Sequence, residues 1–270
     1  MSIEQQEESL SREESFISHL IELRARLLRA LTAVAVLFVG LMVWPGSNVI
    51  YDLLALPLRS ALPSSASMIA VGVVTPFFVP IKLTMLVAFV LALPFVLYQA
   101  WAFVAPGLYA HERRLILPLV AGSVLLFLAG MAFCYFFVFN MAFRFIVSVS
   151  PESVQMMTDI DQYLSFVTTM FLAFGVTFEV PVVVILLAKM GVVSVAKLRN
   201  ARPYVIVGAF VVAAIVTPPD VVSQIMLAIP MCLLYELGIF IAAAISKQEP
   251  AAEPDGNAVA PVEPGESGNG

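Results

Sequence analysis

The sequence predicts an all-α integral membrane protein with six transmembrane helices, both termini on the cytoplasmic side, and two short final spans. The amino-acid composition predicts that the protein lies in a membrane. Apolar residues make up 61% of the 270 residues and charged residues only 12%, whereas soluble domains carry about 25% charged residues. The mean hydropathy is +0.97. A chain with so little charge cannot cover its surface in water, so we expect lipid to surround it.

Six apolar stretches are candidates for the spans, because about 20 apolar residues cross roughly 30 Å of hydrocarbon. They cover about 27–44, 76–101, 115–139, 164–188, 203–217 and 221–245. The fifth lies between Pro203 and Pro218, and its roughly 15 positions reach only about 22 Å at about 1.5 Å per residue. A tight turn, Thr217–Asp220, joins it to the sixth. We therefore expect the last two spans to form a short helical hairpin that thins the bilayer locally.

The distribution of Lys and Arg indicates the orientation, because cytoplasmic loops carry an excess of positive charge. Of the 14 basic residues, only Arg59, Lys82 and Arg144 fall on the predicted outer side. The others gather on the opposite side: Arg12, Arg24, Arg26, Arg29, Arg113, Arg114, Lys189, Lys197, Arg199, Arg202 and Lys247. This asymmetry predicts that both termini lie in the cytoplasm.

The chain divides into three predicted regions. Residues 1–14 are an acidic N-terminus that we expect to be disordered, residues 15–246 form the transmembrane domain, and residues 247–270 are a tail of Ala, Pro, Glu and Gly without apolar periodicity. The two larger outer loops, about 45–75 and 140–163, are expected to carry short amphipathic helices over the bundle. The absence of an internal repeat in the sequence argues against an inverted-repeat transporter.

Signatures of enzymes are missing from the sequence. The stretch "HERR" (His111–Arg114) lacks the second histidine of a zinc-binding HExxH motif, and there is no G-x-S-x-G, no P-loop and no Cys/His cluster. Cys134 and Cys232 fall in apolar stretches, where cysteine behaves as a small hydrophobic residue. We expect no enzymatic activity, no metal, no cofactor and no nucleic-acid partner.

Glu22 is the first candidate binding residue. It lies in an amphipathic segment, Ser15–Leu31, that is expected to lie at the membrane interface and continue into the first span. Arg26 follows four residues later, a spacing that favours an ion pair within one helix. The sequence leaves two interpretations open: this intrahelical pair, or a carboxylate that faces a basic ligand.

Glu112 is the second candidate. Arg113 follows it directly, but adjacent residues on a helix do not face each other and pair poorly. A carboxylate near anionic lipid headgroups is unfavourable without a cationic partner. The alternatives are a solvated loop charge and a binding residue whose cation comes from another molecule.

Glu179 lies well within the fourth predicted span. A charge there costs about 2.5–3.5 kcal/mol on insertion scales, so we expect it to be protonated, paired or facing a wet cavity. Pro181 follows closely and is expected to kink the helix. A satisfied internal hydrogen bond and a functional role both remain open. One alternative function is therefore a proton-coupled small-molecule secondary transporter that uses Glu179 as a relay, and another is a structural scaffold without a ligand.

Four stretches resemble the TatC family, the multispanning subunit of the twin-arginine protein translocase. They are "SHLIELRARLL" (18–28), "WAFVAPGLYAHERR" (101–114), "YLSFVTTMFLAFGVTFEVPV" (163–182) and "RPYVIVGAFVVAAIVTPPDVVSQIMLAIPM" (202–231). The likeness covers about residues 15–245. It implies six spans in the bacterial cytoplasmic (inner) membrane, with both termini in the cytoplasm.

The resemblance also implies a function. The chain would be the core receptor that binds twin-arginine signal peptides of folded cargo proteins. It would assemble with the single-span partners TatA and TatB, self-associate into a multimeric complex, and support transport driven by the proton-motive force. By motif match, Glu22, Phe103 and Glu112 would contribute to the signal-peptide site. Positions that match family residues important for translocation are Arg24, Pro57, Pro94 and Asp220, and Glu179 matches the intramembrane glutamate.

Overall fold

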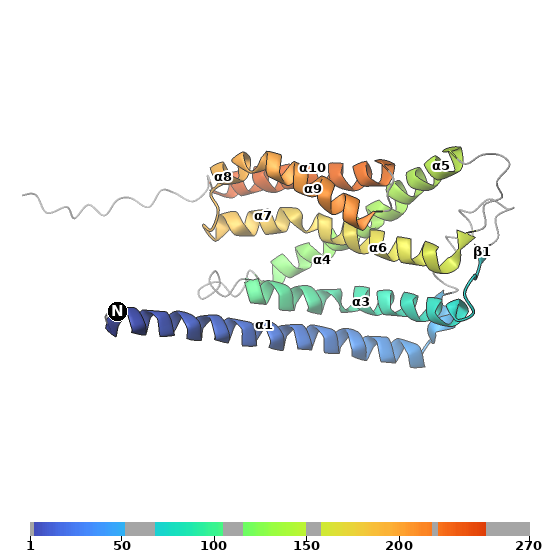
Figure 1. The fold of residues 1–270 in the computed structure, drawn as a ribbon, viewed down its shortest axis with the longest axis horizontal. Helices are drawn as coiled ribbons and strands as arrows, with labels where there is room; N and C mark the ends of the chain where they lie inside the picture. Colours follow the sequence, from blue (N-terminus) through green and yellow to red (C-terminus); the bar gives the residue numbers. More distant parts are fainter. Residues whose placement is uncertain (1–2, 52–67, 105–115, 150–157, 218–220, 247–270) are drawn as a thin grey trace, which may run out of the picture.

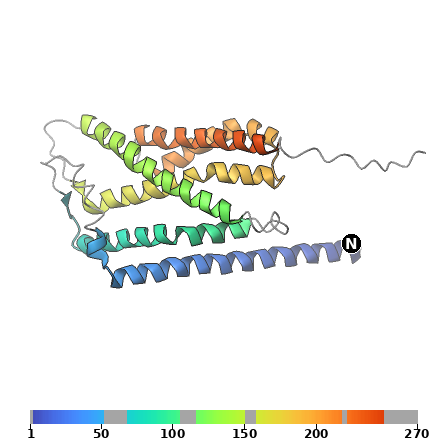
Figure 2. The same cartoon turned by 180° about the vertical axis from the view of Figure 1, so that it is seen from behind.

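The computed structural model describes residues 3–51, 68–104, 116–149, 158–217 and 221–246 as a bundle of helices that run lengthwise beside one another (Figures 1 and 2). Residues 47–51 are also helical. The labelled helices are α1 (Ile3–Val43), α3 (Thr75–Val104), α4 (Ile116–Phe133), α5 (Phe139–Val149), α6 (Ile160–Phe178), α7 (Val180–Lys189), α8 (Val195–Asn200), α9 (Arg202–Val216) and α10 (Val221–Ser246). A π-helical segment, Cys134–Val138, connects α4 to α5.

The two ends of the bundle differ. At one end, here called the strand end, β1 (Met68–Ile69) pairs in parallel with β2 (Thr158–Asp159). The first residues of α1 and the last residues of α10 lie at the opposite end, here called the N-terminal end (Figure 1). Apart from the two-residue strands, the regular structure of the described ranges is helical, in agreement with the predicted fold class.

Five helical stretches are long and apolar enough to cross a membrane: Ile17–Val43, Thr75–Phe103, Leu117–Ala142, Ile160–Lys189 and Val221–Ile245. They correspond to predicted spans one, two, three, four and six. The predicted fifth span is the shorter apolar helix α9, Arg202–Val216. Its 15 residues are too few to cross about 30 Å of hydrocarbon at about 1.5 Å per residue, as its bracketing prolines indicate.

The structure differs from the sequence-based description at the N-terminus. Residues 3–14, expected to be disordered, are the first turns of α1, which continues without a break to Val43. The segment expected to lie at the interface is part of this same helix. Its glutamates explain the difference, because Glu has high helix propensity and negative charge near a helix N-terminus is stabilising.

The third span also extends further than predicted. The π-helical segment and α5 carry its helix on to Val149, so part of the expected outer loop 140–163 continues the span helix. Figure 2 shows this helix crossing α6 obliquely. Parts of both outer loops (52–67 and 150–157) and the tail 247–270 lie outside the described residues.

Glycines permit the closest contacts between the helices. A methyl group at Gly130 on α4 would lie 2.5 Å from the backbone oxygen of Phe174 on α6. One at Gly238 on α10 would lie 3.0 Å from the Cα of Pro181 on α7. The α4–α6 and α7–α10 pairs therefore form a tightly packed unit, whereas α1 packs mainly along α3.

Replacing Gly130 by alanine is expected to destabilise the bundle by about 1–3 kcal/mol, the usual cost of overpacking, because the new methyl group meets the backbone of Phe174 as well as the Phe178 ring. Thermal melting in detergent measures the change. Gly122→Ala, on the same helix, is the matched control, because no atom lies within 4 Å of its added carbon. Equal melting temperatures for the two variants would contradict the packing described here.

Candidate functional site

At the N-terminal end, α1 and α3 bring Phe103 against a side chain that the sequence analysis did not select. His19 on α1 stacks on the Phe103 ring, with centroids 4.4 Å apart and an interplanar angle of 23°. Glu22 lies three residues beyond His19, so the two share one side of the helix. Two predicted site residues that are 81 positions apart in the chain, Glu22 and Phe103, are thus linked through His19, which stacks on Phe103 and shares one side of α1 with Glu22.

Glu22 forms the intrahelical pair that its spacing predicted. Its Oε1 accepts hydrogen bonds from Arg26 Nε at 2.9 Å and from Nη2 at 2.6 Å. The Glu22 side chain nevertheless keeps 37% of its surface exposed. A carboxylate has about four lone-pair sites, so Glu22 retains the capacity to accept from a second cation while Arg26 holds its position.

The other residues selected by motif match are not part of this contact in the described ranges. Arg24 is exposed on α1. It lies two residues after Glu22 and therefore on a different face of the helix. Pro94 lies within α3 and is exposed. Pro57, Glu112 and Asp220 lie outside the described residues. The segment containing Glu112 follows directly after Val104, the last residue of α3.

Glu179 interrupts the fourth span. α6 ends at Phe178 and α7 begins at Val180, and Pro181 cannot donate to the carbonyl of Thr177 four residues before it. The expected kink is therefore a break between two helices. The Glu179 side chain points into the protein, where the residue is only 8% exposed.

The Glu179 carboxyl group lacks a protein hydrogen-bond partner among the described residues: both oxygens are buried without one. Ser123 on α4 lies near this carboxyl group, but the two side chains do not form a hydrogen bond. The Ser123 hydroxyl instead accepts from Trp101 Nε1 at 2.9 Å. Since buried polar groups are nearly always paired, this carboxyl group is suited to receive a donor from outside the chain.

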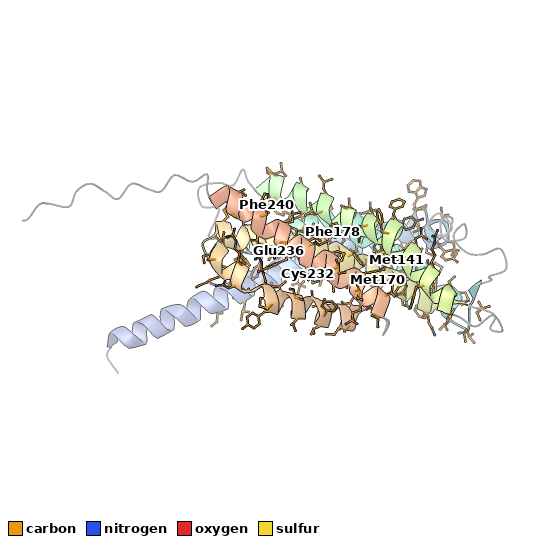
Figure 3. All side chains as sticks on the ribbon, turned by 90° about the horizontal axis from the view of Figure 1, so that it is seen from above. Met141, Met170, Phe178, Cys232, Glu236 and Phe240 are labelled. Atoms are coloured by element: carbon orange, nitrogen blue, oxygen red, sulfur yellow. The ribbon has the colours of Figure 1, made fainter. Side chains whose placement is uncertain are left out.

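A third polar feature fixes the α9–α10 hairpin at the N-terminal end. Arg202 at the start of α9 donates to both carboxylate oxygens of Glu236 on α10, at 2.6 and 2.7 Å. The Tyr235 hydroxyl donates to the Leu198 carbonyl of α8 at 2.9 Å. Figure 3 labels Glu236 on α10, with Cys232 one turn further along. The bidentate geometry holds the short helix α9 against its neighbour.

Three of these arrangements were missed by sequence reasoning for identifiable reasons. His19 was not selected, because its role as a ring that stacks on Phe103 depends on the pairing of α1 with α3. Ser123 is a small residue in an apolar span, and only the packing of α3, α4 and α6 gives it partners. Glu236 pairs with Arg202, which lies 34 residues away in the sequence.

Comparison with known proteins decides the family. A sequence model described as "Sec-independent protein translocase protein (TatC)" matches residues 18–230. The chain belongs to the TatC family. Among TatC proteins, that of Azotobacter chroococcum mcd 1 is 56% identical over 240 residues, which cover 89% of this chain and 93% of that protein. The TatC of Escherichia coli strain K12 is 56% identical over 224 residues, 83% of this chain and 86% of that one.

Solved structures agree with this assignment. The chain resembles the crystal structure of "Twin Arginine Translocase Receptor- TatC" with a TM-score of 0.74 and 37% identity. The match covers 84% of this chain and 99% of the other. As a TatC protein, the chain is a component of a bacterial membrane protein translocase, and its family consists of transport receptors rather than catalysts.

Proposed function

We propose that this TatC protein is the core receptor of a twin-arginine translocase and reads the consecutive arginines of signal peptides at its N-terminal end. The observation that carries the proposal is the contact between His19 and Phe103, which places an aromatic ring beside the helix face that carries Glu22. Glu112, in the segment after α3, would complete an acidic patch around this ring. Site-specific photocrosslinking between a signal peptide and the helix face that carries Glu22 tests this proposal.

Guanidinium chemistry explains why such a patch would prefer arginine. A planar guanidinium docks on a carboxylate through two parallel hydrogen bonds and stacks on aromatic faces, whereas lysine offers a compact point charge. Glu22 already accepts one such group from Arg26. Two carboxylates and an aromatic face would therefore suit two adjacent arginines better than any single charged residue.

The proposed orientation places the N-terminal end in the cytoplasm of a bacterium and the protein in its cytoplasmic (inner) membrane. Supporting this, the start of α1 and the end of α10 lie at the same end of the bundle (Figure 1). Lys189, Lys197, Arg199 and Arg202 belong to or lie beside the short helix α8 at that end, and positive charge favours the cytoplasmic side.

Cysteine labelling tests this orientation. With Cys134 and Cys232 replaced by alanine, a cysteine at Val73, which is 99% exposed at the strand end, should react with an impermeant thiol reagent added to intact cells. A cysteine at the exposed Lys197 should react only after the membrane is opened. Labelling of the Lys197 position in intact cells would contradict the orientation.

We also infer that TatA and TatB, which carry single spans, dock along α9. Ala209 and Ala213 are buried toward the bundle, whereas Tyr204, Val207, Val211 and Ile215 form an exposed stripe on the opposite face. Helix association in membranes depends on close packing more than on single hydrogen bonds, which average about 0.6 kcal/mol in one membrane protein. A short span with such a face suits a partner helix.

Tryptophan at Val207 or Val211 is therefore expected to reduce copurification of TatB and TatA several-fold without changing the level of this chain. The physical reason is that a bulkier ring separates the two helices along the exposed stripe of α9. Leu117→Trp on α4, at a position 76% exposed, is the matched control and should leave copurification intact. If both α9 variants retain their partners as the control does, α9 is not the docking face.

A further inference from the structure

A cavity of about 330 Å³ lies toward the strand end, between α3, the π-helical segment and α6. Its lining is almost entirely aliphatic and aromatic, and it includes three tyrosines, Tyr51, Tyr135 and Tyr163. Leu91 and Tyr135 are respectively 56% and 40% exposed, so the cavity opens at the side of the bundle. The lining residues of α3 and α6 belong to stretches long and apolar enough to span the membrane.

The length of the cavity corresponds to one leaflet. On α3 the lining runs from Val79 to Leu91 and on α6 from Ile160 to Phe171. These segments extend about 16–18 Å at about 1.5 Å per residue, close to half of the roughly 30 Å hydrocarbon core. A cavity of this volume spread over that length is narrower than an α-helix, whose diameter with side chains is about 10–12 Å.

These dimensions favour a flexible hydrocarbon chain as the occupant. Apolar cavities stay dry, so water does not fill this one. An empty cavity would forfeit the dispersion contacts of its walls, and it opens sideways toward the acyl chains that surround a membrane protein. A lipid acyl chain matches the size and the shape of the cavity and needs no polar partners, while a helical segment of a peptide is too wide.

An ion pair at the strand end of the cavity wall indicates the headgroup. Lys82 Nζ lies 2.5 Å from Asp161 Oδ1, and the two side chains are 48% and 37% exposed. Lys82 is flanked by the lining residues Val79, Leu83 and Leu86, and Asp161 follows the lining residue Ile160. Exposed ion pairs add little stability, so this pair can rearrange to meet a ligand.

We propose that the cavity holds one acyl chain of a phospholipid from the leaflet at the strand end, with a zwitterionic, amine-bearing headgroup held between Lys82 and Asp161. The phosphate accepts from Lys82 and the ammonium group donates to Asp161. A purely anionic headgroup meets repulsion from Asp161, and a phosphocholine has no N–H to donate. The site is independent of the receptor function proposed above, and on the proposed orientation it belongs to the outer leaflet.

Native mass spectrometry of the purified chain tests the site, with phosphatidylethanolamine, phosphatidylglycerol and phosphatidylcholine added at equal concentrations. One phosphatidylethanolamine is expected to remain bound per chain. Leu86→Trp, which fills the cavity, should lower its retention at least tenfold relative to Leu125→Trp, a control on α4 at a position 67% exposed. Equal retention in the two variants would overturn the proposal.

If Leu86→Trp fails to fold, two variants of the headgroup site and a crosslink still test the proposal. Lys82→Ala should reduce retention of phosphatidylethanolamine. Asp161→Asn should raise retention of phosphatidylglycerol relative to that of phosphatidylethanolamine. In the wild-type chain, a phosphatidylethanolamine with a photoreactive acyl chain should attach within residues 79–91 or 160–171. Attachment only elsewhere, unchanged lipid preference in both variants, or capture there of a signal peptide's apolar segment in place of lipid would each contradict the proposal.

Discussion

Replacing Glu112 with alanine is expected to weaken binding of a twin-arginine signal peptide by about 10- to 100-fold. Hydrogen bonds to charged groups are worth about 1.5–3 kcal/mol, and about 1.4 kcal/mol corresponds to a tenfold change in affinity. Phe103 in the last turn of α3 and the surrounding lipid would shield the contact and keep it near the upper part of this range. Binding of a labelled signal peptide to membranes containing the chain measures the effect.

Variants at the same position separate charge from reach. Glu112→Asp retains the charge on a shorter side chain and should cause a milder loss, whereas Glu112→Arg adds repulsion between like charges and should be the most severe. The substitution is expected to act on peptide binding and not on folding, so the amount of chain in the membrane should not change. In a double-mutant cycle, Glu112→Ala should have little further effect on a peptide whose arginines are replaced by glutamine. An equal loss for both peptides would show that Glu112 does not read the arginines.

Replacing Glu179 with leucine is expected to abolish most transport, whereas Glu179→Gln should retain a substantial part of it. Both carboxyl oxygens are buried without a hydrogen-bond partner among the residues that the structure describes, so the native group is suited to a donor supplied during assembly or transport. An amide oxygen can still accept that hydrogen bond and avoids the insertion cost of a charge, about 2.5–3.5 kcal/mol. Leucine fills the space but cannot accept.

Transport of a folded reporter with a twin-arginine signal measures this difference. Ser123→Ala is a useful companion variant, because it removes the neighbouring hydroxyl and leaves Trp101 Nε1 without its acceptor while keeping the Glu179 carboxyl. Complete loss in both Glu179→Gln and Glu179→Leu would contradict a role based on polarity alone. It would indicate that the group must carry a proton, as in the secondary-transporter alternative.

The sequence predicted the helical membrane class and the approximate spans because these depend on composition and on apolar length. The shortness of α9 followed from Pro203 and Pro218, and the break at Glu179 from Pro181. The helical N-terminus was missed because an acidic, polar composition resembles that of a disordered segment. Residues 3–14 are nevertheless helical, because Glu has high helix propensity and the segment continues into a long span helix.

The candidate site was predictable only in part. Phe103 was selected by family resemblance alone, whereas Glu22 was also a candidate from its amphipathic segment, and the structure confirms the ion pair that its spacing to Arg26 predicted. The stacking of His19 on Phe103, the approach of Ser123 to Glu179 and the pairing of Arg202 with Glu236 all depend on which helices are neighbours. Single-sequence periodicity describes the faces of one helix and does not identify the partner helix.

Site-specific photocrosslinking tests the receptor proposal most directly. A photoreactive residue at Leu23, which lies four positions from His19 and is 41% exposed, is compared in membranes with one at Val73, 99% exposed at the strand end. We expect a crosslink from position 23 to a signal peptide with two arginines, at least several-fold less crosslinking to one with two lysines, and none from position 73. Equal yields for the arginine and lysine peptides at position 23, or crosslinks from position 73 alone, would contradict the receptor proposal.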